Sequence, residues 1–141
     1  MHTLRHVIQR QQLVHAAPTA TVFDVAALMA EARVGCIPVL AGEELVGVFS
    51  ERDLMTRVVV EGRDPRATSV GSVMSRGVIT AALDDRVERC LDKMRSRGCR
   101  HLPVMEEGRV IAMISMRDLM RDEIEEQVEE IRGLREYIHQ A

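Results

Sequence analysis

Aromatic side chains are almost absent from this chain of 141 residues, which has no tryptophan, one tyrosine and two phenylalanines. Its core must therefore consist of aliphatic side chains. Many proteins that bind single-stranded nucleic acid stack the bases on aromatic rings, so this shortage argues against such a function. The net charge of −3 also lacks the basic excess that nucleic-acid binding requires. We therefore expect no nucleic-acid partner.

Paired cysteines and long apolar runs are missing as well. Cys36, Cys90 and Cys99 form no CxxC motif and no disulfide framework, which is typical of reduced thiols in the cytoplasm. No segment approaches the roughly 18 apolar residues of a membrane span, and the first residues contain no apolar stretch suited to a signal peptide. We expect a cytoplasmic protein with no membrane partner. Cys90 and Cys99 with His101 match no common zinc spacing, so no metal site is predicted.

The sequence does contain an internal repeat. Residues 22–57 recur at 87–122 with a shift of 65 residues and no gap. The most faithful part is polar, Ser-x-Arg-Asp-Leu-Met, and occupies 50–55 and 115–120. Core positions drift among apolar residue types, so an unchanged polar element at one spacing predicts two equivalent sites.

Each copy predicts the order strand, helix, strand, strand, helix, in an α/β (α+β) fold. In the first copy we expect a strand at 13–16, a capped helix from Val22 interrupted by Gly35, strands at 37–40 and 45–49, and a helix from Ser50. In the second copy we expect a strand at 78–81, a helix from Val87 to about Gly98, strands at 102–105 and 110–114, and a helix after Ser115. Residues 70–74 also echo 4–8 with a shift of 66. One copy alone would be marginally stable, so the two should pack together.

The last segment, 116–140, predicts one long helix with an apolar stripe. The stripe consists of Leu119, Met120, Ile124, Val128, Ile131, Leu134 and Ile138. It could fold back on the domain or pack against a second chain. We favour homodimerisation.

Two interpretations of Ser50-Glu51-Arg52-Asp53 and its second copy remain open. Serine followed three residues later by an acid is a helix capping box. The same element also follows a strand and opens a helix, where backbone N–H groups bind phosphate. Arginine adds donors for phosphate, and a carboxylate suits the hydroxyls of a ribose.

The ordered pattern of helix, Pro-Val strand, hairpin, Ser-x-x-Asp strand end and helix, present twice, resembles a tandem pair of CBS domains, the Bateman module. The resemblance covers about 4–125 and is greatest to small stand-alone bacterial CBS-pair proteins. It implies CBS domains at 4–66 and 70–125, each a small sheet with two helices, related by a pseudo-two-fold axis. A C-terminal helical extension, 126–141, would follow.

The resemblance implies a regulatory binding module, not an enzyme, with no catalytic cofactor. Family members commonly bind AMP, ADP, ATP, NAD or S-adenosylmethionine in clefts between the copies. We expect an adenine nucleotide as ligand, a homodimer, and an unknown effector protein as partner. The alternative is a dimerising structural or partner-binding protein that binds no nucleotide.

The resemblance also implies which residues form the two sites. Ribose hydroxyls would bind Asp53 and Asp118. Phosphate or ribose would contact Ser50 and Ser115, and the phosphates would lie near Arg52 and Arg117. Adenine would meet the backbone of Cys36, Ile37, His101 and Leu102, beside Pro38 and Pro103. The cleft would be lined by His15, Ala16, Thr80 and Ala81. Gly47 corresponds to Ala112 in the second copy, so we slightly favour the first copy for close approach of a ligand to the backbone.

Overall fold

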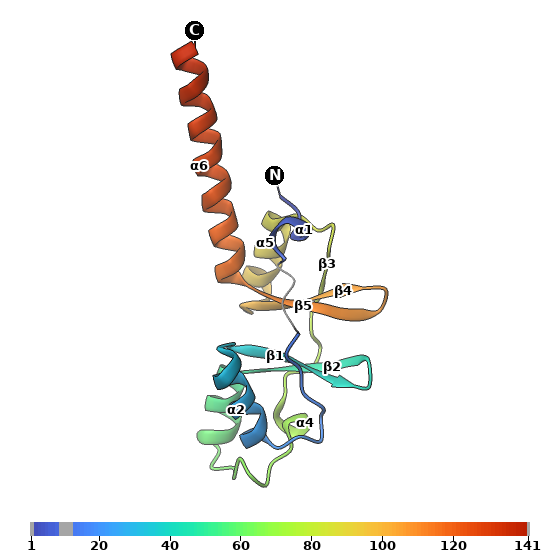
Figure 1. Ribbon diagram of the computed structural model, residues 1–141. Helices are drawn as coiled ribbons and strands as arrows, with labels where there is room; N and C mark the ends of the chain where they lie inside the picture. The colour runs from blue at the N-terminus through green and yellow to red at the C-terminus, as the bar shows by residue number, and fades with distance from the viewer. Residues whose placement is uncertain (1, 9–12, 141) are drawn as a thin grey trace.

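The computed structural model describes residues 2–8 and 13–140 and consists of two similar halves from which a long helix projects (Figure 1). One half contains α2 (Val22–Ala32), β1 (Cys36–Ala41), β2 (Glu44–Ser50), α3 (Glu51–Asp53), the π-helix η1 (Leu54–Val59) and α4 (Val70–Val73). The other half contains α1 (Leu4–Val7), β3 (Ala81–Ala82), α5 (Val87–Arg97), β4 (His101–Glu106), β5 (Arg109–Ser115) and α6 (Met116–Gln140). The mixed α/β fold predicted from the repeat is confirmed.

The hairpins of the two halves have the same register. β1 and β2 are antiparallel with Pro38 opposite Val48, and β4 and β5 are antiparallel with Pro103 opposite Met113. Each hairpin also has an irregularity at the same repeat position, after Val39 and after Val104. The two hairpins face each other at the middle of the molecule (Figure 1).

The first strand of each copy is shorter than the sequence predicts. β3 has only two residues and runs parallel to β4. In the first copy, 13–16 forms no strand, and a single bridge joins Ala16 to Val39. The Ala16 N–H donates to Pro38 O at 3.2 Å and its carbonyl accepts from the Leu40 N–H at 2.8 Å. These contacts place the segment beside β1 without a regular strand.

The short helices α1 and α4 pack across the repeat. Val70 and Val73 of α4 lie in the core formed by α2, β1 and β2. Leu4 of α1 lies in the core formed by α5, β4 and β5, although it precedes the first copy in the chain. Each core is therefore completed by the segment that lies before the other copy, and this exchange joins the halves.

Most predicted helix boundaries are confirmed. The Thr21 hydroxyl accepts from the Asp24 N–H at 3.2 Å, and α2 starts after it. α2 ends, however, at Arg33 in a left-handed conformation, with φ of 56°, and not at Gly35. Gly35 serves another contact, since a Cβ there would lie 2.6 Å from Glu51 Oε1.

α6 confirms the prediction of one long helix over 116–140. Leu119 is buried in the core of the second copy, whereas the later apolar residues are exposed. In the part of the chain that the structure describes, no helix is both long and apolar enough to cross a membrane.

Candidate functional site

Both Ser-x-x-Asp elements form capping boxes. In the first copy, the Ser50 N–H donates to Asp53 Oδ2 and the Asp53 N–H donates to Ser50 Oγ, each at 3.1 Å. In the second copy, Ser115 and Asp118 make the same pair of bonds, again at 3.1 Å. The simpler interpretation of the element is therefore correct for both copies, and each aspartate keeps one carboxylate oxygen for another contact.

The remaining oxygen of Asp53 is occupied within the protein. Ser75 Oγ donates to Asp53 Oδ1 at 2.9 Å, and Arg57 Nε lies 3.7 Å from the same oxygen. The Asp53 side chain is only 9% exposed. The Arg57 guanidinium also donates to the carbonyls of Val73 and Met74. Asp53 is thus part of a network that holds the segment after α4.

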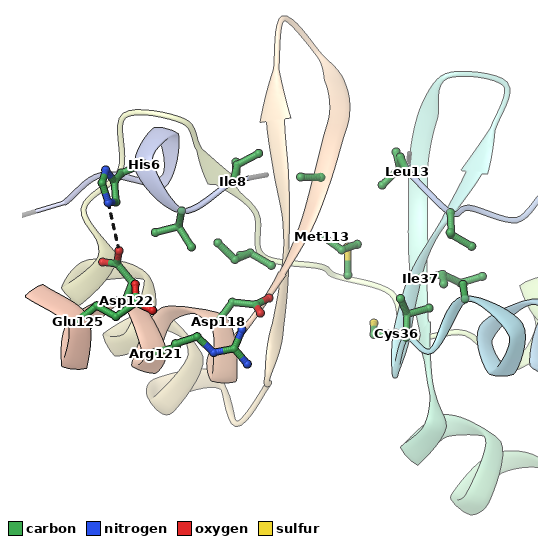
Figure 2. A pocket seen from close by; sticks show the side chains of 16 residues that line it. His6, Ile8, Leu13, Cys36, Ile37, Met113, Asp118, Arg121, Asp122 and Glu125 are labelled. Carbon is green, nitrogen blue, oxygen red and sulfur yellow. Dashed lines mark ion pairs between the residues drawn. The ribbon is translucent and has the colours of Figure 1, made fainter. Parts of the chain in front are cut away.

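Asp118 has different surroundings. It is partly exposed, and within 2–8 and 13–140 no hydrogen-bond donor contacts its Oδ1. It lines a pocket of about 420 Å³ between the two halves, within the roughly 300–1,000 Å³ typical of small-molecule sites. We call this the Asp118 pocket (Figure 2), and it is lined by His6, Val7, Ile8, Leu13, Val14, Ala32, Val34, Cys36, Ile37, Ala112, Met113, Ile114, Asp118, Arg121, Asp122 and Glu125.

The Asp118 pocket combines an apolar wall with a charged one. Cys36 and Ile37 of β1 and Met113 of β5 lie on the apolar side (Figure 2). The charged side comes from α6, where Asp118, Arg121, Asp122 and Glu125 share one helix face at steps of three and four residues. The pocket therefore joins the start of β1 from one copy to the Ser-x-x-Asp helix of the other.

Arg121 is a pocket residue that the sequence did not reveal. We expected Arg52 and Arg117 to approach a phosphate, but both side chains are exposed and neither lines the pocket. Arg121 lies one helical turn after Asp118 and corresponds to Thr56 in the first copy, so the repeat gave no signal for it. The usable signal was its position three residues after Asp118, because residues three apart lie on the same face of a helix.

The other predicted residues divide between pocket, core and surface. Cys36 and Ile37 line the pocket, whereas Pro38, Leu102 and Pro103 are buried in strands. Ala16 and Ala81 belong to the two cores. His15 is exposed at a hollow near the hairpin tips, and the Thr80 carbonyl accepts from Lys93 Nζ at 3.2 Å.

Two titratable groups at the strand starts have shifted pKa values. Burial, with the nearby Asp53 carboxylate next in importance, raises the pKa of the Cys36 thiol to about 12. The thiol is therefore protonated at neutral pH and a poor nucleophile. Burial also lowers the pKa of His101, against the opposing effects of Glu51 and Asp118. Both shifts favour the uncharged form of the side chain.

Gly47 does not provide close approach of a ligand. A Cβ at this position would lie 2.6 Å from Met74 Sδ and 2.8 Å from the Ser75 carbonyl oxygen. The glycine instead allows β2 to bridge Ser75 through Val48. The expectation based on Gly47 is therefore wrong, and the preference for the first copy loses its basis. Ala112, its counterpart, lines the Asp118 pocket.

Comparison with known families identifies both copies. The model of the CBS domain matches residues 4–60 and 70–125. The chain is also similar to the mitochondrial CBS domain-containing protein CBSX3 of Arabidopsis thaliana, with 33% identity over 123 residues. That alignment covers 84% of this chain and 60% of the relative. The chain thus spans about 60% of the length of this relative.

Solved structures agree with the fold. The CBS domain NE2398 has a TM-score of 0.82 and 31% identity, over 87% of this chain and 98% of that one. The CBS domain protein PAE2072 from Pyrobaculum aerophilum, solved in complex with AMP, has a TM-score of 0.76 and 28% identity. That match covers 83% of this chain and 89% of the other.

Proposed function

The chain belongs to the CBS-domain family, and from this premise we propose that it is a non-enzymatic regulatory module that binds an adenosine nucleotide in the Asp118 pocket. The carrying observation is the carboxylate of Asp118, which faces a pocket and has an oxygen that the capping box does not use. The similar protein from Pyrobaculum aerophilum was solved with AMP, which supports an adenosine ligand.

Each part of AMP has a suitable counterpart in the pocket. The unused oxygen of Asp118 can accept from ribose hydroxyls. Ile37 and Met113 offer an apolar wall to the adenine, and the backbone at Cys36 and Ile37 can pair with its edge. The Arg121 guanidinium can hold a phosphate through two parallel hydrogen bonds.

The charge of the pocket predicts which nucleotide binds best. Among the residues that the structure describes, Asp118, Asp122 and Glu125 outnumber the cation Arg121 on the α6 wall. Like charges at close range disfavour binding of a polyanion. We therefore expect AMP to bind more tightly than ATP, with NAD and S-adenosylmethionine as the other adenosine ligands to compare.

Calorimetry with AMP, ATP, NAD and S-adenosylmethionine tests the proposal. We expect AMP binding, and a loss of at least about tenfold in affinity for Asp118→Asn, because a charged hydrogen-bond acceptor contributes roughly 1.5–3 kcal/mol. Asp53→Asn is the matched control, since it changes the same capping box without facing the pocket. If no adenosine ligand binds at millimolar concentration, the alternative of a dimerising protein without nucleotide is favoured.

Binding in the Asp118 pocket can reach a partner through α6. The pocket residues Asp118, Asp122 and Glu125 lie on one side of this helix, and the exposed Ile124 and Ile131 lie on the other, as 3.6 residues per turn requires. We propose that the second side forms a homodimer and that an effector protein in the cytoplasm senses its arrangement. A ligand changes that arrangement only if it binds one state more tightly.

A further inference from the structure

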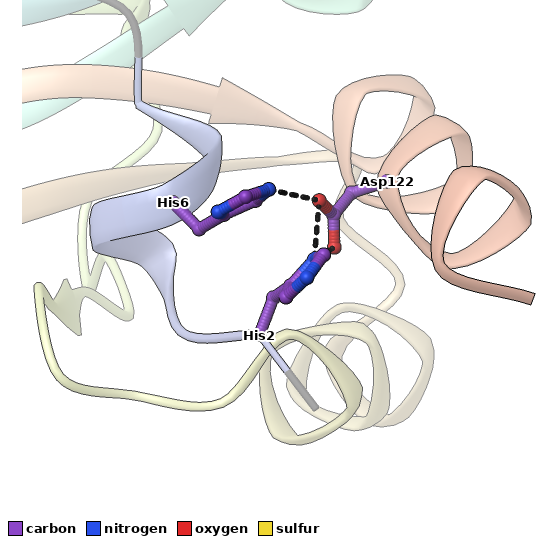
Figure 3. Close-up of side chains that lie close together, drawn as sticks. All are labelled: His2, His6 and Asp122. Carbon is purple, nitrogen blue, oxygen red and sulfur yellow. Dashed lines mark hydrogen bonds and ion pairs between the residues drawn. The ribbon is translucent and has the colours of Figure 1, made fainter. Parts of the chain in front are cut away.

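Two imidazoles and a carboxylate from distant parts of the chain meet at the base of α6 (Figure 3). His2 Nδ1 lies 2.9 Å from Asp122 Oδ1 and 3.0 Å from Oδ2, and His6 Nε2 lies 3.8 Å from Oδ1. The two imidazole rings are stacked with centroids 3.7 Å apart. No spacing motif could reveal this group, because His2 and Asp122 are separated by 120 residues in sequence.

The burial of Asp122 makes this group unlike a surface ion pair. Its side chain is only 6% exposed, against 20% for His2 and 60% for His6. A carboxylate removed from water needs strong partners. Its counterpart in the first copy is Arg57, which binds the carbonyls at the end of α4 directly. At the position where the first copy has the Arg57 guanidinium, the second copy thus has the Asp122 carboxylate, which contacts the imidazoles of His2 and His6.

We propose that His2, His6 and Asp122 bind a divalent transition-metal ion, with Zn²⁺ as the best fit. Imidazole nitrogen and carboxylate oxygen are usual Zn²⁺ ligands. The three ligand atoms all lie within 4.8 Å of one another. Tetrahedral Zn²⁺ with bonds of about 2.0–2.1 Å needs ligand atoms about 3.3 Å apart. The two nitrogen–oxygen distances, 2.9 Å for His2 and 3.8 Å for His6, lie on either side of this value.

Such an ion would fasten the start of the chain to α6. His6 belongs to α1, whose Leu4 completes the core of the second copy, and Asp122 belongs to α6. Three protein ligands leave a fourth position for water or another donor. Metal binding should therefore stabilise the contact of α1 with α6 and raise the melting temperature, since a ligand of the folded state favours that state.

Calorimetry of the full chain with ZnCl₂ tests this proposal, after removal of any polyhistidine tag. We expect one equivalent of Zn²⁺ to bind, and the d–d absorption of bound Co²⁺ to report tetrahedral coordination. Asp122→Asn and His6→Gln should each weaken Zn²⁺ binding by at least about tenfold. Substituting even the residues that hydrogen-bond to metal ligands lowers metal affinity by that factor. The His6→Gln variant is expected to fold even if Asp122→Asn does not, because the His6 side chain is mostly exposed.

The matched control is His139→Gln, which removes an exposed histidine from the last turn of α6. It should bind Zn²⁺ like the parent and show the same rise in melting temperature. The proposal is overturned if the parent chain binds no Zn²⁺ at millimolar concentration. Undiminished binding by both Asp122→Asn and His6→Gln would overturn it too. His6 and Asp122 also line the Asp118 pocket, but neither measurement includes a nucleotide, so failure of this proposal can be distinguished from failure of the proposed function.

Discussion

Asp53 and Asp118 show that identical residues of a repeat can have different surroundings. Both carboxylates accept from the backbone of the preceding serine at the same distance. Ser75 and Arg57 then occupy the first, while the second faces the Asp118 pocket. The difference comes from residues that are not identical in the two copies, because Ser75 and Arg57, which contact Asp53, lie outside the Ser-x-x-Asp element.

His101 predicts a dependence of stability on pH. Burial lowers its pKa in the folded protein, so below the ordinary value of about 6.5 the unfolded chain binds a proton first. The contribution of His101 to the free energy of unfolding should be constant above that pH. It should decrease as the pH falls from about 6.5 through the lowered pKa of the folded state. Urea unfolding between pH 7.5 and pH 5 measures this. The free energy of unfolding of the His101→Gln variant should decrease less steeply over the same pH interval. A variant with the same pH dependence as the parent would contradict the prediction.

At the scale of elements, the close packing of β2 makes Gly47 sensitive to substitution, whereas Gly133 of α6 is not packed against other atoms. Gly47 faces Met74 and Ser75, with hydrogen bonds of 3.0 and 2.8 Å between Val48 and Ser75. These bonds fix the chain after α4 against the hairpin of the first copy. Gly133, by contrast, lies in the exposed part of α6 with nothing within 4 Å of a Cβ.

These two glycines predict substitutions of opposite sign. Gly47→Ala should lower the free energy of unfolding by about 1–3 kcal/mol, because the added methyl overlaps atoms that are already packed. Gly133→Ala should raise it by up to about 1 kcal/mol, because alanine favours the helix. Urea denaturation of both variants beside the parent chain gives the two values. A neutral Gly47→Ala would show that the contact with Ser75 is not tight.

At the scale of the whole molecule, the exposed side of α6 has the pattern of a coiled coil. Ile124, Ile131 and Ile138 recur every seven residues, and Met120 and Leu134 occupy the intervening seam with Gln127. In parallel coiled coils, isoleucine at one seam position with leucine at the other favours two strands, and Leu134 is the leucine at the second position here. Glu130 of one copy would then lie opposite Arg135 of the other, which adds a favourable charge pair.

Ile131→Asp should convert the proposed dimer to a monomer, because it places a charge in the centre of the seam. Arg132→Asp introduces the same side chain on the opposite side of the helix, and should remain dimeric. Sedimentation equilibrium or light scattering at several protein concentrations distinguishes the two states. A monomeric parent chain, or an Ile131→Asp variant that stays dimeric, would refute the parallel pairing.

Local and periodic features of this protein were determined by the sequence alone. The 65-residue repeat specified two similar halves, and apolar periodicity specified α5 and the full extent of α6. The Ser-x-x-Asp spacing specified both capping boxes. The helices and the capping boxes depend on residues only a few positions apart, whose geometry the backbone itself dictates.

Contacts between distant segments were decided only by the tertiary structure. These include the exchange of α1 and α4 between the two cores, the packing of Met74 against Gly47, and the contact between His2 and Asp122. They also include the choice of Asp118 over Asp53 as the aspartate that faces a pocket. A repeat specifies which residues are equivalent in sequence, but side-chain volume and chain path determine what covers each one.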